Sequence, residues 1–156
     1  MGAAINLVDW SLLETVFDHL RRRNCRYKFG AKAPSLDADT EDCPFLDCSG
    51  FTRFAIAKAS EQRVIIPDGS VAQHDWCDES DFRRLAHYSD CGYAAHDPRR
   101  WFMAFLEPHA GRAGHVWLVN AGKTRESCGS LGVASRPYDT KVLLARCCAA
   151  YEVTRL

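Results

Sequence analysis

The sequence of 156 residues has no long hydrophobic run and no excess of either charge. No segment approaches the eighteen or more consecutive apolar residues that a transmembrane helix requires, so we expect no membrane span. The apolar stretch at the N-terminus contains Asp9, Glu14 and Asp18, which does not fit a secretory signal peptide. We therefore expect synthesis in the cytoplasm without a signal peptide.

The balance of charge removes one class of partner. Twenty Lys and Arg residues face twenty Asp and Glu residues, so the formal net charge is +0 at pH 7. A chain without a basic excess has no general attraction for nucleic acid or for an anionic membrane surface. We expect no nucleic-acid partner.

The eight cysteines contain no C-x-x-C pair, so paired zinc ligands are poorly supported. His74 with Cys77, and His87 with Cys91, have spacings that occur in metal sites, but neither pair has a second pair of ligands beside it. We expect no metal and no organic cofactor. In the absence of an export signal, reduced thiols are the default, and most of them are expected in the core.

The length fits a single domain, 1–156, whose two halves differ in pattern. Residues 8–23 and 48–60 repeat apolar side chains at helical spacing, and a brief third helix is expected over 70–76. Residues 78–96 are predicted to form a short helix and loops. The segment 78–100 is interpreted as an insertion between the N-terminal and C-terminal halves.

The second half predicts an antiparallel sheet. The apolar run at 101–107 predicts one strand. The apolar run at 115–120, the tight turn after it and the polar run at 124–127 together predict a β-hairpin, and 128–140 is predicted to be a loop. The expected strands are 101–107, 115–120, 124–127 and one within 142–156. The predicted class is α+β, with N-terminal helices packed on a C-terminal antiparallel sheet.

The stretch "FLDCSGFTRF" (45–54) places a cysteine at the start of an apolar helix. The free N–H groups and the dipole at a helix N-terminus favour the thiolate of Cys48, which is the nucleophilic form. Asp47 or Ser49 can cap this helix, and Gly50 leaves room for a substrate backbone. A buried structural cysteine under a helix cap is the alternative, and this stretch alone does not separate the two.

A thiolate nucleophile needs a base, and the base needs an orienting group. Of the six histidines, His115 opens the predicted strand "HVWLVN" at an edge from which its ring can project. Glu126 follows eleven residues later, and the hairpin turn brings it close to His115. A carboxylate there would hold the imidazole in one tautomer, although spacing does not fix the face that each side chain takes.

Four motifs occur in one order along the chain: "YKFGAKAP" (27–34), "DCSGF" (47–51), "IIPDGSVAQ" (65–73) and "GHVWLVNAGKTRES" (114–127). Over most of its length the chain resembles the NlpC-type papain-like cysteine peptidases, which cut bacterial cell-wall peptides. The run that begins at His115 is more similar to phage-associated and other non-exported members than to the secreted lipoproteins.

The resemblance implies a circularly permuted papain fold. It assigns Cys48 as the nucleophile and His115 as the general base and acid. The third polar residue, usually histidine in this family, falls on Glu126, which is a departure that a carboxylate can accommodate.

The resemblance also implies a substrate subsite beside the nucleophile. Tyr27, Asp47 and Ser49 match positions that line this subsite and hold the free amine of the peptidoglycan stem peptide. The implied function is a monomeric cysteine peptidase that cuts stem peptides at the D-glutamyl to diamino-acid bond. Phage lysis or a dedicated secretion machine would bring it to the cell wall. A thiol amidase or transacylase of the same fold, or a non-catalytic relic used for binding, are the alternatives.

Overall fold

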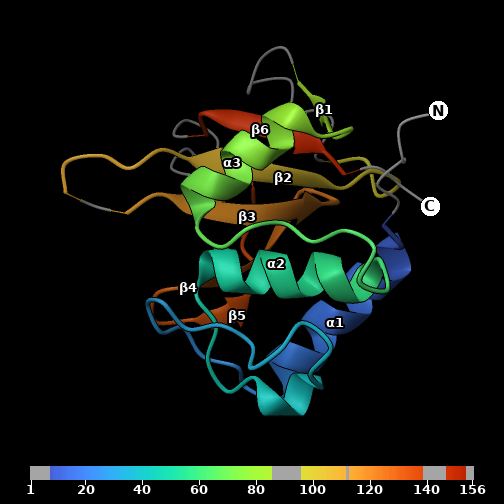
Figure 1. Cartoon of the computed structure of the whole chain (residues 1–156), viewed down its shortest axis with the longest axis vertical. Coiled ribbons are helices and arrows are strands. Elements are labelled where there is room, and N and C mark those ends of the chain that lie inside the picture. The colour runs from blue at the N-terminus through green and yellow to red at the C-terminus, as the bar shows by residue number, and fades with distance from the viewer. Residues whose placement is uncertain (1–7, 86–95, 112, 139–146, 154–156) are drawn as a thin grey trace.

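The computed structural model describes residues 8–85, 96–111, 113–138 and 147–153 (Figure 1). Within these ranges, three α-helices and a short 3-10 helix precede an antiparallel sheet with the strand order β1-β6-β2-β3-β4-β5. The elements are α1 (Trp10–Arg22), η1 (Thr40–Asp42), α2 (Cys48–Ala59), α3 (Ser70–Glu79), β1 (Arg83–Arg84), β2 (Phe102–Leu106), β3 (His115–Asn120), β4 (Lys123–Cys128), β5 (Gly132–Ala134) and β6 (Ala149–Glu152). The α+β prediction is confirmed. No helix in the described ranges has the length and apolar character needed to cross a membrane.

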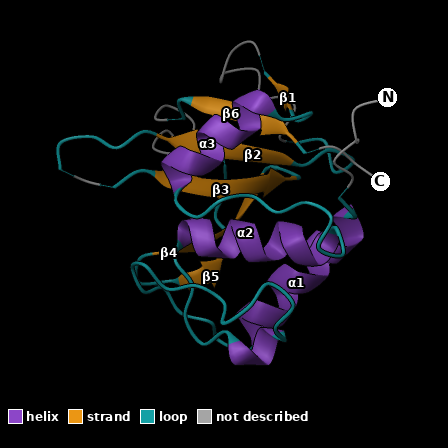
Figure 2. Ribbon diagram, viewed as in Figure 1, coloured by secondary structure: helices purple, strands orange, loops and turns teal. Residues whose placement is uncertain are grey.

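The sheet separates two apolar clusters because neighbouring residues of β2 and β3 point to opposite faces. Both faces are covered, which explains why these strands read as continuous apolar runs. The helices lie on one face (Figure 2), where α2 packs on β3 and β4. The helix-facing residues of β2 and β3 are Met103, Phe105, Val116 and Leu118, and the opposite face carries Phe102, Ala104, Trp117 and Val119.

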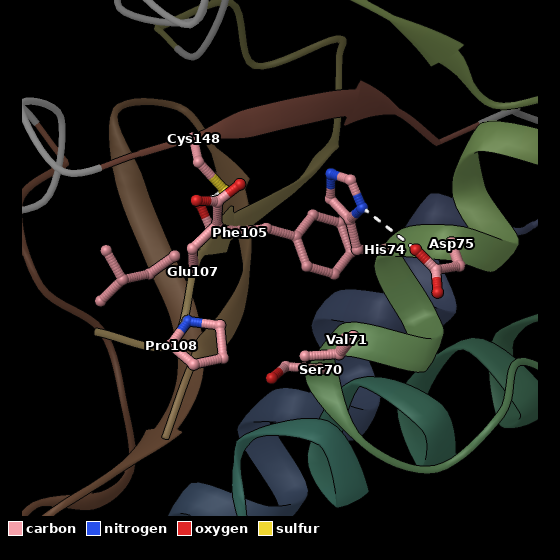
Figure 3. Close-up of a pocket in the computed structure, with 9 residues that line it drawn as sticks. Ser70, Val71, His74, Asp75, Phe105, Glu107, Pro108 and Cys148 are labelled. Carbon is pink, nitrogen blue, oxygen red and sulfur yellow. Dashed lines mark hydrogen bonds and ion pairs between the residues drawn. The ribbon is translucent and has the colours of Figure 1, made fainter. Parts of the chain in front are cut away.

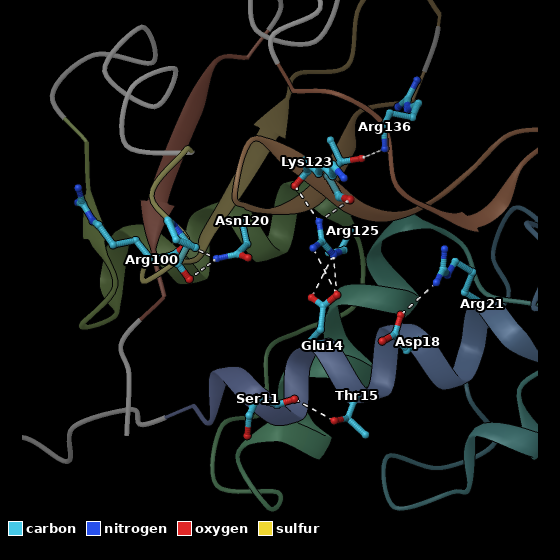
Figure 4. Close-up of polar contacts among 12 residues, drawn as sticks. Ser11, Glu14, Thr15, Asp18, Arg21, Arg100, Asn120, Lys123, Arg125 and Arg136 are labelled. Carbon is cyan, nitrogen blue, oxygen red and sulfur yellow. Dashed lines mark hydrogen bonds and ion pairs between the residues drawn. The ribbon is translucent and has the colours of Figure 1, made fainter.

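Helix α1 begins after a capping aspartate, and an ion pair connects it to strand β4 of the sheet. Asp9 Oδ1 accepts hydrogen bonds from the backbone N–H of Ser11 (2.8 Å) and Leu12 (3.3 Å). Arg125 of β4 reaches Glu14 of α1, with 3.1 Å between Nε and Oε2 (Figure 4). This contact and the apolar face of α1 hold the first helix against the later half of the chain. The buried residues of that face are Leu13, Val16, Phe17 and Leu20.

Two parts of the sheet differ from the sequence predictions. β5 lies within the segment predicted as a loop, and it pairs with β4 from Glu126↔Ala134 to Cys128↔Gly132. Gly132 has φ +69°, and a Cβ there would lie 2.5 Å from the carbonyl oxygen of Cys25. Because a contact with a distant segment fixes this short strand, local propensity gave no sign of it.

The segment predicted as a short helix and loops begins with the end of α3 and then forms the strand β1. Arg83 and Arg84 pair with Glu152 and Tyr151 of β6. The strand is thus an edge strand whose position is set by its pairing with β6. His87 and Cys91 lie outside the described residues.

Candidate active site

Cys48 is the first residue of α2, and the aspartate before it organises the helix entrance. Asp47 Oδ1 accepts hydrogen bonds from Gly50 N (2.6 Å) and Ser49 Oγ (3.1 Å), and its Oδ2 accepts one from Gly30 N (3.1 Å). Cys48 is 8% exposed and borders a cavity of about 520 Å³. The nucleophile candidate is therefore held at a capped helix N-terminus with access to open space.

The room at Gly50 serves the fold and not a substrate, which corrects the prediction from sequence. A Cβ at this position would lie 2.6 Å from the carbonyl oxygen of Ala31 and 3.0 Å from Asp47 Oδ1. The same Ala31 carbonyl accepts a hydrogen bond from Asp47 N at 2.9 Å. Gly50 thus permits a loop of the same chain to pack against the helix cap.

A second contact fixes the entrance of α2 to the sheet. Ser127 Oγ, on β4, donates a hydrogen bond of 2.6 Å to the carbonyl of Leu46, two residues before Cys48. Ser127 follows Glu126 directly in the strand. The bond therefore sets the distance between the start of the nucleophile helix and the strand that carries the carboxylate.

His115 begins β3 and lies on the face of the strand that carries Trp117. The two rings stack, with centroids 5.4 Å apart and an interplanar angle of 26°. The paired residues of β3 and β4 run from Asn120↔Lys123 to Leu118↔Arg125, and Glu126 follows Arg125 toward the end of β3 at which His115 lies. His115 Nε2 lies 2.8 Å from Glu126 Oε1.

Glu126 is fully buried, and three side chains hold its carboxylate. Besides His115, Arg136 donates to both oxygens, with Nε 2.9 Å from Oε2 and Nη2 2.6 Å from Oε1, and Thr124 Oγ1 donates to Oε2. Burial alone would raise the pKa of Glu126, but the bonds from His115, Arg136 and Thr124 lower it to about 2. The carboxylate is ionised at neutral pH.

The ionised carboxylate and the nearby thiol act together on His115. Burial opposes the imidazolium form, yet hydrogen bonding to Cys48 and Glu126 and their charges raise the pKa of His115 to about 9. Since Nε2 faces Glu126, Nδ1 is the ring nitrogen left for the Cys48 thiol. At neutral pH the ring is an imidazolium that lies between the Glu126 carboxylate and Cys48.

Tyr27 stands between the two parts of the site. Its segment forms a parallel bridge, Arg26↔Phe45, with the strand-like residues before α2. Tyr27 borders the cavity of about 520 Å³ with Cys48, and it also borders a cavity of about 260 Å³ with His115. Burial and the neighbouring Cys48 and Asp47 raise the pKa of Tyr27, so its phenol is neutral.

The six residues singled out in the sequence thus lie in one region, but two of them also have a structural role. Asp47 and Ser49 line the cavity beside Cys48 while also forming the helix cap. Arg136 and Thr124 were not identified from sequence. The signal for them is indirect, because a buried carboxylate requires donors, yet the sequence does not say which side chains supply them.

The structure gives no grouping of three or more His, Cys, Asp or Glu suited to a metal within the described ranges. Cys77 is buried, with Sγ 4.0 Å from Met103 Sδ, whereas His74 borders a surface cavity. The spacing of His74 and Cys77 therefore reflects one core position and one surface position on α3.

Comparison with known proteins supplies a fold. No protein-family model matches the chain, and no curated protein matches it. A crystal structure of a protein described as similar to a lipoprotein, of the NLP/P60 family, from Staphylococcus aureus subsp. aureus Mu50, matches with a TM-score of 0.60 and 14% identity. The match covers 100% of this chain and 46% of that chain, so this chain spans less than half the length of its structural neighbour. The chain has an NlpC/P60-like fold of the papain-like type.

Proposed function

We propose that the chain is a cysteine peptidase that hydrolyses peptide bonds in peptidoglycan stem peptides. The observation that carries the proposal is the linked set of Cys48, His115 and buried Glu126, with 2.8 Å between His115 Nε2 and Glu126 Oε1. The cavity beside Cys48 gives a substrate access to the thiol. The NlpC/P60-like fold supports the same reaction class.

The chemistry follows from the ionisation of the site. An imidazolium beside a thiol stabilises the thiolate, and the Cys48 sulfur attacks the peptide carbonyl. The backbone N–H groups at the start of α2 stabilise the oxyanion. His115 gives its proton to the leaving amine as the C–N bond breaks, and the acyl group remains on sulfur as a thioester. His115 then takes a proton from water, which attacks the thioester and releases the carboxylic acid and Cys48.

The supporting residues keep the base in place. Glu126 holds the imidazole by its Nε2 and stabilises the imidazolium. Arg136 and Thr124 fix the carboxylate of Glu126 in turn. These two are positioning residues, because they reach His115 only through Glu126.

The acyl side of the substrate lies against Tyr27, Asp47 and Ser49 in this proposal. All three border the same cavity as Cys48. The Asp47 carboxylate and the Tyr27 hydroxyl offer a free amine of the stem peptide an anion and a neutral acceptor. Asp47 then does two tasks, capping α2 and binding the amine.

The bond proposed is the one between D-glutamate and the diamino acid of the stem peptide. The protein acts as a monomer of one domain, 1–156, with residues 78–100 as an insertion, and reaches the cell wall through phage lysis or a dedicated secretion machine. The similarity of the run from His115 to phage-associated members stays a prediction from sequence.

The first test is a digest of purified peptidoglycan by the wild-type protein and by Cys48→Ala, with the released fragments identified by mass spectrometry. We expect stem-peptide fragments from the wild type alone, with masses that identify the bond. If the wild type releases nothing while iodoacetamide alkylates Cys48 readily near neutral pH, the peptidoglycan assignment is wrong. An amide or acyl-transfer substrate is then sought.

A further inference from the structure

The cavity beside Cys48 continues into a second cavity of similar size. The cavity of about 520 Å³ that contains Cys48 shares Ser70, Val71, Asp75 and Pro108 with a cavity of about 500 Å³. The second cavity, here named the α3–β2 cavity, lies between α3 and the end of β2 (Figure 3). The two form one groove that passes the nucleophile.

The order along this groove distinguishes the two sides of the scissile bond. Tyr27 and Asp47 border the cavity of Cys48 but not the α3–β2 cavity. In the proposed function they take the acyl side. The amine component, which leaves first, then extends toward α3, and this inference therefore rests on the proposed function.

The α3–β2 cavity has an apolar surface suited to an aliphatic stem. Phe105 borders it from β2, and the His74 ring stands edge-on to the Phe105 ring, with centroids 5.3 Å apart and an interplanar angle of 89°. Val71 is exposed on one wall and Pro108 lies on the opposite wall (Figure 3). An unbranched methylene chain fits between such walls without burying a polar group.

The Asp and Glu side chains among the described lining residues give the groove a negative charge. No Lys or Arg occurs among the described residues that line the two cavities. Asp68 is already paired with Lys32 at 3.0 Å. Asp47 caps α2 on the acyl side, so Asp75 and Glu107 are left on the side of α3, and they come from opposite walls of the α3–β2 cavity. Asp75 has His74 Nδ1 at 3.7 Å, and its side chain is 74% exposed, so it can face a ligand.

We propose that the α3–β2 cavity binds the side chain of the leaving amine component and selects a side chain with an aliphatic stem and a terminal ammonium group. Phe105, Val71 and Pro108 contact the stem, and Asp75 and Glu107 attract the ammonium. Diaminopimelate carries an additional carboxylate at the end of its side chain, which would face the same two acids with no guanidinium among the described lining residues. The groove thus prefers a lysine-type stem peptide to a diaminopimelate-type one.

The test uses three synthetic stem peptides that differ only in the residue after the scissile bond: lysine, norleucine or diaminopimelate. We expect the wild type to show the highest kcat/KM with lysine, about tenfold above norleucine, as two partly exposed ion pairs allow. In the double variant Asp75→Asn, Glu107→Gln, the ratio of lysine to norleucine falls to near one. Glu79→Gln is the matched control, because Glu79 is exposed on the same helix and lines neither cavity, and it should keep the ratio.

The outcomes separate this inference from the proposed function. Cleavage of all three peptides with equal kcat/KM, dependent on Cys48, overturns the selectivity and leaves the peptidase intact. A preference for diaminopimelate, or a lysine preference that the double variant retains, also overturns it. If no peptide is cleaved in a manner dependent on Cys48, the proposed function fails and this inference fails with it.

Discussion

At the scale of single residues, Glu126 is the most constrained group in the site. It is fully buried and ionised, and its two oxygens accept hydrogen bonds from His115, Arg136 and Thr124. A carboxylate buried without such partners would be costly. The arrangement therefore makes the orientation of His115 depend on a network, and not on one bond.

We expect Glu126→Gln to slow turnover about 100-fold without abolishing it, because the amide keeps a hydrogen bond to the ring but loses the charge. The pKa of His115, raised to about 9 with Glu126 ionised, should move down toward 6.5. The reactive state pairs the Cys48 thiolate with the imidazolium form of His115. A lower pKa of His115 should therefore move the alkaline limb of the pH–rate profile to lower pH. An NMR titration of His115 and the pH dependence of kcat/KM measure both shifts.

A neutral result would identify a different orienting group. If Glu126→Gln leaves the rate and the His115 pKa unchanged, Glu126 is only a structural partner of Arg136. Thr15→Ala serves as a control, because Thr15 bonds the backbone of its own helix at Ser11 and is exposed. It should alter neither quantity.

The sequence could predict part of this site. Cys48 and His115 each stand at the start of an element, where a local pattern marks them. Glu126 could be placed near His115 because a tight hairpin turn fixes which residues of its two strands lie close together. Arg136 lies beyond the short strand β5, and its approach to Glu126 depends on the path of a segment that has no periodicity. Local patterns therefore find the reacting groups and miss the residues that support them.

At the scale of elements, a buried glutamine connects α2, which carries Cys48, to α3, which lines the groove. Gln73 of α3 donates from Nε2 to the carbonyls of Ser49 (2.9 Å) and Pro67 (3.0 Å). Its Oε1 accepts from Thr52 Oγ1 of α2 at 2.7 Å. Gln73 and Thr52 are both fully buried, so the helices share one satisfied polar contact within an apolar layer.

We expect Gln73→Leu to lower the free energy of unfolding by about 2 kcal/mol, because it leaves the buried Thr52 hydroxyl and two carbonyls with fewer partners. Thr52→Val should cost about 1 kcal/mol, and the double variant should cost less than the sum by about 1 kcal/mol. Urea unfolding of the three variants measures these values. Ser35→Ala, which removes an exposed bond to Asp37, is the control and should change stability by less than about 0.5 kcal/mol.

Strict additivity of the two changes would contradict the proposed link between the helices. In that case Thr52 would be satisfied by the carbonyls of its own helix, Cys48 and Ser49, which lie at 3.3 Å and 3.0 Å. The groove wall would then be held by apolar packing alone.

Elements with their own caps or periodicity were predictable, and those defined by distant partners were not. α1 follows the capping Asp9, and α2 follows the capping Asp47, so both starts could be placed from local chemistry. β1 and β5 are two and three residues long and exist because β6 and β4 offer an edge. Such strands carry too few residues for a period of two to appear.

At the scale of the whole molecule, the two halves of the chain are held together by burial and by ionised contacts between them. Arg125 of β4 reaches Glu14 of α1, and in the His115–Glu126 pair the Glu126 side chain is fully buried while that of His115 is 18% exposed. The stability of the fold therefore depends on the charge state of groups that the catalytic site also uses. This coupling makes a global measurement sensitive to the site.

The sign of the coupling follows from the two shifted groups. Glu126 has its pKa lowered from 4.5 to about 2, so its contribution is present above pH 4.5 and is lost as the pH falls toward 2. His115 has its pKa raised from 6.5 to about 9, so its contribution is complete below pH 6.5 and is lost as the pH rises through 9. Both contributions are complete only between pH 4.5 and 6.5.

We therefore expect the free energy of unfolding, measured in urea, to be highest between pH 4.5 and 6.5 and to decline in two steps on the alkaline side. The first step, between 6.5 and about 9, comes from His115. The second begins near 9, because burial raises the pKa of the Cys25 and Cys43 thiols to about 12 and about 11, and only the unfolded chain ionises them there. His115→Gln should remove the first step and keep the second. A first step that persists in this variant would assign the neutral-range dependence to another histidine and would remove the link between the site and the stability of the fold.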